Sequence, residues 1–148
     1  MSAAANKKLI QEIYTHAGSR TASPTFRSNV ADDVRWVVTG QYSWSHTFVG
    51  LDVIANNLLG RVRELMAEGT RTVAFNFIAD GDYVVVEAKG DNVTKTGVRY
   101  DNDYCMIWRF ENGKIKEIKE YCDSALVERV LGPFPASRLP GTKVAAEA

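Results

Sequence analysis

Three charged residues lie within otherwise apolar, strand-like segments of the sequence, and their side chains could transfer protons. Glu87 and Lys89 are two positions apart and therefore share one face of a strand, while Glu120 shares its face with apolar neighbours on the last strand. If these faces meet in the interior, they form a buried Glu-Lys-Glu cluster suited to general acid-base chemistry. The alternative is a set of exposed ion pairs with neighbouring lysines, and the sequence leaves both open.

Three further residues are candidates for chemistry. His46 lies in an aromatic segment and is either a general base or acid near neutral pH, or a loop histidine packed through its ring. Tyr14, on the apolar face of the first helix, is either a hydrogen-bond donor to an oxyanion or a packing residue. Asn102 shares a face with Tyr104, so its amide reaches a ligand if that face lines a cavity.

Several function classes are disfavoured. The 148 residues, with 18 basic and 18 acidic side chains, predict one neutral domain with no patch for nucleic acid. No apolar run is long enough to span a membrane, and we expect a cytoplasmic protein. There is no nucleophile elbow, phosphate-binding loop or metal-spaced histidine pair, so neither metal nor cofactor is expected. Cys105 and Cys122 are expected to be free thiols.

The elements that must position these side chains follow from hydrophobic periodicity and turn residues. Helical spacing predicts helices at 7–17, 51–66 and 124–131, the first with Asn6 as N-cap and Gly18 as its end. Alternating or β-branched runs predict strands at 34–38, 41–49, 70–79, 83–88, 98–110 and 114–122. Asp80-Gly81-Asp82 and Asn112-Gly113 predict tight hairpins, and Asp123 is expected to cap the last helix.

This order of elements predicts an α+β fold in which helices cover one face of a curved antiparallel sheet. The strand at 98–110 is apolar on both sides near its end, so something must cover each face. We expect helices on one face and a second copy of the chain on the other, which makes a homodimer. The domain is placed at 1–131, and 132–148 is a Pro/Ala-rich tail, either an arm or disordered.

The segment from Tyr104 to Ile115, YCMIWRFENGKI, and the later Glu120-Tyr121-Cys122-Asp123 resemble the SnoaL-like, ketosteroid isomerase-like branch of the nuclear transport factor 2 superfamily. The resemblance extends over residues 6–131. It implies a cystatin/NTF2-like cone-shaped barrel, dimeric through its sheet, with an apolar cavity for a small organic molecule. Its members include polyketide cyclases, ketosteroid isomerases, dehydratases, limonene epoxide hydrolases and non-catalytic domains.

The catalytic residues of these relatives match this sequence only in part. Tyr14 stands where ketosteroid isomerases carry the tyrosine that donates to the dienolate oxygen. Their proton-shuttling aspartate falls on Val38, after Ala31-Asp32-Asp33. The Arg-x-Asp of limonene epoxide hydrolases reads Glu87-Ala88-Lys89, and the acid on their last strand corresponds to Glu120.

We therefore expect a cofactor-independent enzyme that isomerises, cyclises or dehydrates a hydrophobic carbonyl compound. The predicted base is His46 or Glu120, and the predicted oxyanion donor is Tyr14 or Asn102. The predicted substrate-binding residues are Trp36, Val38, Tyr42, Trp44, Phe75, Glu87, Lys89, Tyr104 and Trp108. The alternative is a ligand-binding or dimerisation domain without turnover, which the residues at the family's base positions favour.

Overall fold

The sheet has six strands in the order β2-β1-β6-β5-β4-β3 in the computed structural model, which describes residues 1–16 and 23–146. The strands are β1 (Val30–Val38), β2 (Thr47–Val49), β3 (Thr72–Asp80), β4 (Tyr83–Gly90), β5 (Asp103–Glu111) and β6 (Lys114–Cys122). Neighbours β3, β4, β5 and β6 pair antiparallel, which confirms the predicted meander. The β1–β6 pair is parallel, which the sequence did not indicate.

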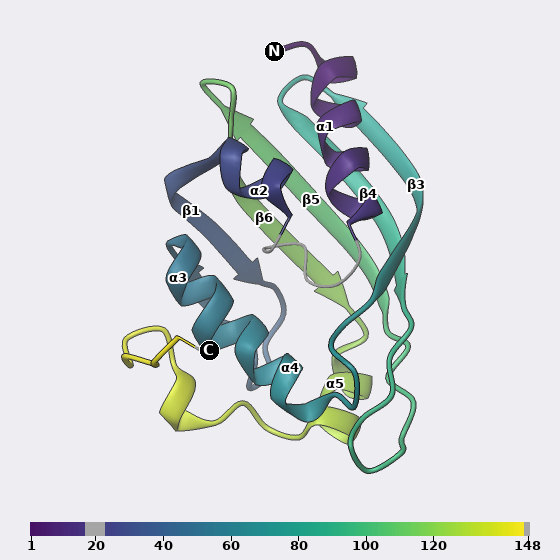
Figure 1. Cartoon of the computed structure of the whole chain (residues 1–148), viewed down its shortest axis with the longest axis vertical. Coiled ribbons are helices and arrows are strands. Elements are labelled where there is room, and N and C mark those ends of the chain that lie inside the picture. The colour runs from purple at the N-terminus through teal and green to yellow at the C-terminus, as the bar shows by residue number, and fades with distance from the viewer. Residues whose placement is uncertain (17–22, 147–148) are drawn as a thin grey trace.

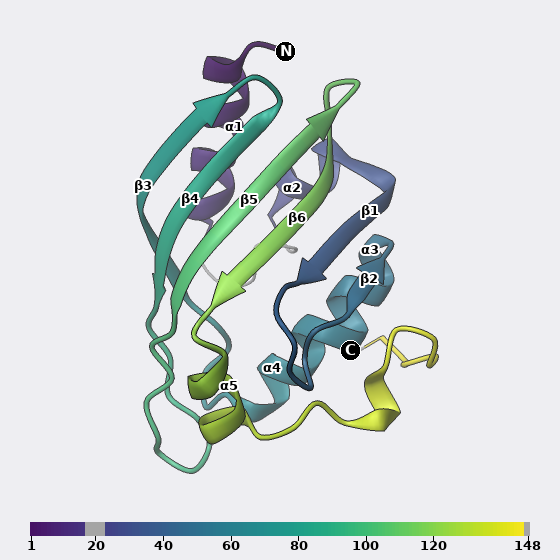
Figure 2. The same cartoon turned by 180° about the vertical axis from the view of Figure 1, so that it is seen from behind.

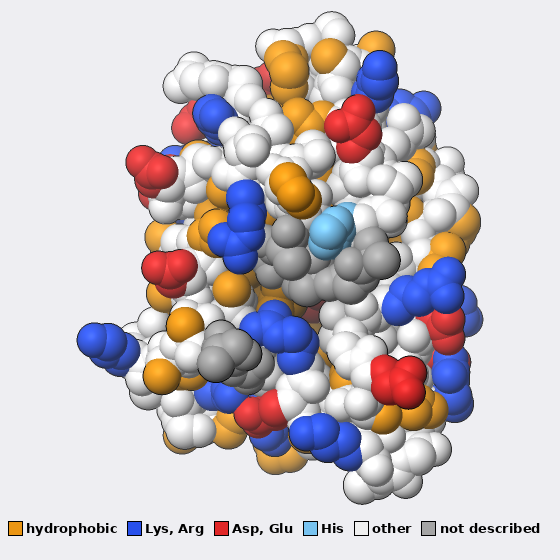
Figure 3. All heavy atoms as spheres, viewed as in Figure 1, with side chains coloured by type: hydrophobic (Ala, Val, Ile, Leu, Met, Phe, Trp, Pro, Cys, Tyr) orange, Lys and Arg blue, Asp and Glu red, His pale blue; other side chains and the backbone are white. Residues whose placement is uncertain are grey.

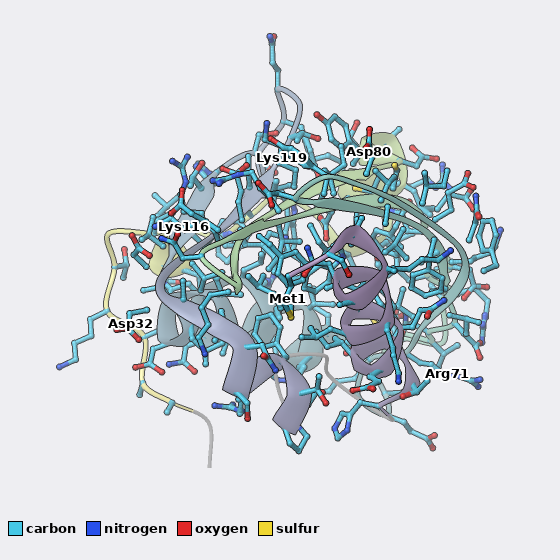
Figure 4. All side chains as sticks on the ribbon, turned by 90° about the horizontal axis from the view of Figure 1, so that it is seen from above. Met1, Asp32, Arg71, Asp80, Lys116 and Lys119 are labelled. Atoms are coloured by element: carbon cyan, nitrogen blue, oxygen red, sulfur yellow. The ribbon has the colours of Figure 1, made fainter. Side chains whose placement is uncertain are left out.

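The helices lie on one side of this sheet (Figure 1), and the opposite side is uncovered in Figure 2. They are α1 (Ala3–Thr15), α2 (Pro24–Asn29), α3 (Leu51–Val53), the π-helical η2 (Ile54–Leu59), α4 (Gly60–Leu65), α5 (Ser124–Leu131) and the short 3₁₀ turn η3 (Ala136–Arg138). Viewed from above, the unclosed sheet curves around α1 (Figure 4). The mixed α+β fold is as predicted. None of the described helices has the length and apolar character needed to cross a bilayer.

The tight turns follow from residues that tolerate positive φ. Asn112 and Gly113 have φ of 51° and 75° between β5 and β6, and Gly81 has φ of 56° between β3 and β4. These are the left-handed conformations that a two-residue hairpin requires. Both predicted hairpins are therefore confirmed.

The first helix begins earlier than predicted. Ser2 is the N-cap, and its hydroxyl accepts a hydrogen bond from the Ala5 amide at 3.1 Å. Three alanines then supply strong helix propensity, so Asn6 lies inside the helix rather than at its cap. The predicted end at Ala17 and Gly18 lies outside the described residues.

The predicted strand at 41–49 is wrong except for its last three residues, which form β2. Residues 40–46 form a loop because Ser45 satisfies the local backbone in place of a strand partner. Its amide donates to the Tyr42 carbonyl at 2.9 Å, and its hydroxyl accepts from the Tyr42 amide at 3.1 Å. Such local side-chain hydrogen bonds compete with a strand ladder.

Two larger departures from the prediction concern α2 and β5. The helix α2 was missed, although Ser23 as N-cap and Pro24 at the first turn are typical start signals. The strand β5 begins at Asp103 rather than at 98, because residues 91–102 fold back on themselves, with an isolated bridge between Val93 and Arg99. The loop that results brings Tyr100 and Asn102 to the end of the sheet.

Alternation along the strands defines two faces. The inner face, toward the helices, carries the core, and its fully buried members include Val34, Trp36, Val84, Val86, Met106, Trp108, Ile115 and Ile118. The outer face carries exposed apolar side chains, among them Val73, Phe75, Ile78, Tyr83 and Tyr121. We use "inner face" and "outer face" in this sense below.

Residues 132–142 form an arm packed on the helices, which we call the C-terminal strap. Asn57 in η2 donates from one amide nitrogen to the carbonyls of Arg138, Leu139 and Thr142 at 2.8–3.2 Å. Arg138 in turn donates to the Asn56 carbonyl and pairs with Glu64. The strap therefore covers the helical segment that spans η2 and α4.

Candidate functional site

An enclosed cavity of about 40 Å³ lies between the inner face of the sheet and the lower helices. One carboxylate, that of Glu120, faces it together with four aromatic residues: Tyr42, Trp44, Tyr100 and Tyr104. Aliphatic side chains from α4, α5 and η2 complete the wall: Leu58, Leu59, Val62, Val127 and Leu131. Among the described residues that line this cavity, none is Lys, Arg or His.

The sheet register places Glu120 in this cavity. On β6 it lies opposite Met106 of β5 on one side and Val38 of β1 on the other, and both of these residues are buried. The backbone at Glu120 is fixed by Thr39, whose amide and hydroxyl donate to the Glu120 carbonyl at 3.1 and 2.8 Å. The carboxylate therefore stands beside Val38, the residue that the sequence resemblance aligns with the base of ketosteroid isomerases.

The loop 40–46 brings Tyr42 and Trp44 into the cavity. Gly40 has φ of 94°, and a Cβ atom there would lie 3.4 Å from the Tyr42 ring, so glycine suits this position. The Trp44 indole nitrogen donates to the Gly132 carbonyl at 2.9 Å. The C-terminal strap thus holds one wall of the cavity in place.

The three tyrosines of the cavity are kept in the neutral form. Burial raises the pKa of Tyr42, Tyr100 and Tyr104, and the charge of Glu120 adds to this increase in each case. A phenol with a raised pKa keeps its proton through the neutral range. These hydroxyls are therefore hydrogen-bond donors, which is what a developing oxyanion needs.

A thiol lies next to this group. Burial and the charge of Glu120 raise the pKa of Cys122 to about 12, and the Tyr42 hydroxyl lies 3.5 Å from its sulfur. A thiol in this state is a poor nucleophile, since the thiolate is the reactive form. Cys122 therefore acts here as a packing group and a weak hydrogen-bond partner.

A second, open cleft of about 860 Å³ lies between the end of α1 and the start of β3. Tyr14 lines it, and its hydroxyl accepts a hydrogen bond from the indole nitrogen of Trp108 at 3.3 Å. His16, Arg63 and Arg71 are also on its wall. The surface view from this side shows charged groups of both signs scattered between apolar ones (Figure 3).

The predicted buried cluster of Glu87, Lys89 and Glu120 is wrong. On β4, the buried positions are Val84, Val86 and Ala88, so Glu87 and Lys89 point to the outer face. Glu87 accepts a hydrogen bond from the Asn76 amide at 2.8 Å, and Lys89 pairs with Asp103 at 3.3 Å. The alternative holds only in part, since Glu87 and Lys89 do make exposed polar contacts, but with Asn76 and Asp103 and not with Lys116 or Lys119.

Phe75 is also on the outer face, with 66% of its surface exposed. There it lines a shallow, open groove of about 470 Å³ together with Glu87 and Tyr104, and it is not part of the wall of the cavity that holds Glu120. An irregularity in the β3–β4 pairing lies between Ala74 and Asn76, where the strand gains one residue. This extra residue changes the alternation along β3. A simple period of two could not predict the side on which Phe75 lies.

His46 lies apart from Glu120 and does not line the enclosed cavity. Its Nε2 is 3.0 Å from the Ser43 carbonyl, and its ring packs against Phe48 and Phe134 with centroids 6.3 and 5.8 Å away. A ring nitrogen at this distance from a carbonyl is a donor. The structure therefore favours the alternative of a loop histidine packed through its ring.

The other predicted site residues divide into two groups. Tyr42, Trp44, Tyr104 and Glu120 line the enclosed cavity. Trp36, Val38 and Trp108 are buried in the core of the inner face and do not line either hollow. Asn102 is fully buried behind Tyr100, and Tyr14 belongs to the open cleft. The structure thus gathers four of the predicted residues in one site.

Tyr100 was not among the predicted site residues. Tyr100 is four residues before Tyr104, so strand alternation would place both side chains on one face, and this pattern could have identified Tyr100. In the structure, Tyr100 lies in the loop that begins at residue 91, where strand alternation does not apply. The aliphatic wall from η2, α4 and α5 was also missed, because helical periodicity identifies a buried face and not the void that it borders. Within the described residues, no group of three acidic, Cys or His side chains could hold a metal ion.

Comparisons with known proteins agree with the fold described above. The model of the SnoaL-like domain family matches residues 10–118. An NTF2-like protein of unknown function from Burkholderia pseudomallei is 28% identical, with a TM-score of 0.71 over 88% of this chain and 98% of that one. No curated protein matches the sequence.

Two further solved structures share the fold at lower identity. A putative SnoaL-like polyketide cyclase from Jannaschia sp. is 17% identical, with a TM-score of 0.68 over 88% of this chain and 93% of that one. TerC, co-crystallised with polyporic acid, is 24% identical, with a TM-score of 0.70 over 85% of this chain and 97% of that one.

Proposed function

Because the chain belongs to the SnoaL-like domain family, we propose that it is an enzyme that uses Glu120 as a general base on a small carbonyl compound, without a cofactor. The observation that carries this proposal is a single carboxylate enclosed with three tyrosine hydroxyls and aliphatic groups. A carboxylate in such surroundings is well placed to move protons.

The proposed reaction starts at the carbon next to the carbonyl group. Glu120 takes a proton from this carbon, and the electron pair of the C–H bond moves to the carbonyl oxygen to give an enolate. The neutral hydroxyls of Tyr42, Tyr100 or Tyr104 donate to that oxygen, because their raised pKa values keep them protonated. The proton then returns from Glu120 to another carbon, which gives isomerisation. In a cyclisation, the enolate carbon attacks a second carbonyl of the same molecule, and the alkoxide formed takes the proton from Glu120.

The lining also supports an uncharged reacting group. The described wall contains no cationic side chain that could pair with an anionic substrate. Its volume of about 40 Å³ is small beside the roughly 300–1,000 Å³ of ordinary ligand pockets. A cavity of this size has room for the reacting end of a substrate and not for a whole drug-sized molecule.

The second candidate function is ligand binding or dimerisation without turnover. Two observations favour it: Val38 at the position of the isomerase base, and the small volume of the closed cavity. The two candidates differ in whether a proton leaves the bound molecule.

Proton exchange separates these candidates. The protein is incubated in D₂O with acetone or cyclohexanone, and deuterium uptake at the carbon next to the carbonyl is followed by NMR. We expect catalysed exchange that Glu120→Gln abolishes and Glu87→Gln leaves intact, since Glu87 is an exposed carboxylate on the outer face. Equal exchange by the wild type and Glu120→Gln would remove the proposed base.

We also propose that the protein forms a homodimer through its outer face. The support is the set of apolar side chains exposed there: Val73, Phe75, Ile78 and Tyr121 have 43–66% of their surface accessible. Their spread over β3 and β6 suits a second copy of the chain, as it would bury them against their own equivalents. A monomer at micromolar concentration in sedimentation experiments would contradict this.

A further inference from the structure

Asn102 is completely buried, and its side-chain amide has a hydrogen-bond partner on each side. The Asp123 amide donates to its Oδ1 at 3.0 Å, and its Nδ2 donates to the Asp123 carbonyl at 3.2 Å. The same Nδ2 donates to the Tyr100 hydroxyl oxygen at 3.0 Å. Rotating the amide by 180° would bring its NH₂ group against the Asp123 N–H, so the backbone fixes its orientation.

This orientation determines what the Tyr100 hydroxyl can do. Asn102 presents an N–H group to Tyr100 and no acceptor, so the oxygen of Tyr100 accepts and its single proton must point elsewhere. The Tyr104 hydroxyl is a second hydrogen-bond partner of Tyr100. Tyr100 lines the enclosed cavity, where Glu120 is the charged acceptor.

We propose that Asn102 is a positioning residue, which commits the Tyr100 hydroxyl to donate its proton into the cavity. In the resting protein that proton is directed toward Glu120, either directly, through the Tyr104 hydroxyl or through a water, for which a cavity of about 40 Å³ has room. With substrate bound it faces the carbonyl oxygen. The catalytic role of this donated proton rests on the proposed function, whereas the orientation of the Tyr100 hydroxyl does not.

Asn102 also has a structural role, so a loss of stability alone would not test the proposal. Asp123, to which it bonds, is the N-cap of α5, with its carboxylate accepting from the Leu126 amide at 3.1 Å. A purely structural Asn102 would affect α5 and leave the direction of the Tyr100 proton unchanged. The test must therefore measure the direction in which the Tyr100 hydroxyl donates its proton.

The informative variant is Asn102→Asp, which has the same shape and keeps the acceptor for the Asp123 amide. It replaces the donor to Tyr100 with a carboxylate oxygen, so Tyr100 should turn its proton away from the cavity. The readout is the NMR signal of Tyr100 in protein with labelled tyrosine, assigned through Tyr100→Phe. Glu120→Gln is introduced into the wild type and into the Asn102→Asp variant, and the change in the Tyr100 signal reports whether the hydroxyl interacts with the Glu120 carboxylate.

In the background that retains Asn102, Glu120→Gln should shift the Tyr100 signal, and in the Asn102→Asp background the same change should have little effect. Asn92→Asp is the matched control: this buried amide contacts the Tyr100 carbonyl at 3.5 Å and not its hydroxyl. It should preserve the response to Glu120→Gln.

The deuterium-exchange assay adds a kinetic readout. Asn102→Asp and Tyr100→Phe should each lower kcat by roughly a hundredfold with little change in KM, as for loss of one oxyanion donor. Combining the two should add little further loss, because both remove the same donated proton.

Two results would overturn the inference. One is an equal response of Tyr100 to Glu120→Gln in both backgrounds. The other is no response in the background that retains Asn102, and this second comparison needs no folded Asn102→Asp variant. If the wild type catalyses deuterium exchange of neither acetone nor cyclohexanone, the proposed function is contradicted. The NMR comparison still determines the orientation of the Tyr100 hydroxyl in that case.

Discussion

Glu120 and Glu87 carry the same carboxylate side chain but lie on opposite faces of the sheet, where their surroundings differ. Glu120 lies opposite Met106 of β5, and Glu87 lies opposite the preceding residue, Cys105. Successive residues of a strand point to opposite faces, so this offset of one position puts Glu120 in an enclosed cavity and Glu87 in solvent.

The difference affects every group around the two carboxylates. On the inner face, the charge of Glu120 reaches three tyrosines and a thiol through a medium with little water, and it raises the pKa of each. On the outer face, Glu87 has one amide partner and abundant solvent, which screens its field. A carboxylate therefore becomes a candidate for catalysis through the face that it occupies, more than through its neighbours in sequence.

The largest expected effect is on catalysis. Glu120→Gln should lower the rate of ketone proton exchange by about 10²–10⁴-fold, the range for loss of a general base. Glu87→Gln should stay within about twofold, since its charge is screened. Comparable losses from both variants would show that the distinction between the faces does not control the chemistry.

The next effect is on stability. Trp108→Ala removes a fully buried ring of the inner face and should lower the free energy of unfolding by about 3–5 kcal/mol. Phe75→Ala, on the outer face, should change the free energy of the isolated monomer by no more than about 0.5 kcal/mol. Urea unfolding at low protein concentration measures both, and similar costs would contradict the assignment of the faces.

The third effect is on thiol chemistry. At pH 8 the thiol of Cys122, with a pKa of about 12, has a thiolate fraction of about 10⁻⁴. A free cysteine, with a pKa of about 8.5, is about one quarter thiolate at the same pH. In Cys105→Ser, the remaining Cys122 should therefore react with a disulfide reagent more slowly than a free cysteine, by roughly a thousandfold from the thiolate fractions. Cys105, on the outer face, should be the faster of the two when Cys122→Ser is tested in the same way.

The same thiol predicts a pH dependence of stability. Its pKa is raised in the folded state, so the folded protein holds this proton more tightly than the unfolded chain. The contribution to stability is therefore complete below about pH 8.5, the ordinary pKa of cysteine, and is lost as the pH rises toward about 12. Cys122→Ser should make the decline between pH 9 and 11 shallower in thermal unfolding measured across this range.

The smallest effect concerns assembly. Phe75→Glu places a charge among the exposed apolar side chains of the outer face and should weaken the proposed homodimer by about tenfold or more in Kd, a cost of roughly 1.4 kcal/mol. Sedimentation velocity over a dilution series measures this. An unchanged distribution would remove the outer face as the dimer contact.

The sequence predicted most of this sheet because its signals are local. Asn112-Gly113 specifies a turn that two neighbouring strands can form alone, and β6 and α5 have the boundaries that periodicity and the Asp123 cap indicated. The parallel β1–β6 pair was not predicted, because the two strands are about 80 residues apart in the sequence. Local sequence patterns identify a strand but do not specify the distant strand with which it pairs.

The candidate site was harder to predict than the sheet. Glu120 and Tyr104 could be identified because strand alternation determines the face. Tyr100 and the loop with Tyr42 depend on how irregular backbone folds, which side-chain hydrogen bonds of Ser45 and Asn102 determine. The small volume of the cavity depends on packing that no residue pattern encodes.

The parallel contact between β1 and β6 also has a consequence for the order of synthesis. Val38 receives its neighbour Glu120 only after another 82 residues have been added. Until then β1 has only the three-residue β2 as a strand partner, and buried residues such as Trp36 lack the neighbours that β6 supplies. The cavity is thus completed late in translation, and the buried apolar residues of β1 are open to contact with other chains until β6 has been synthesised.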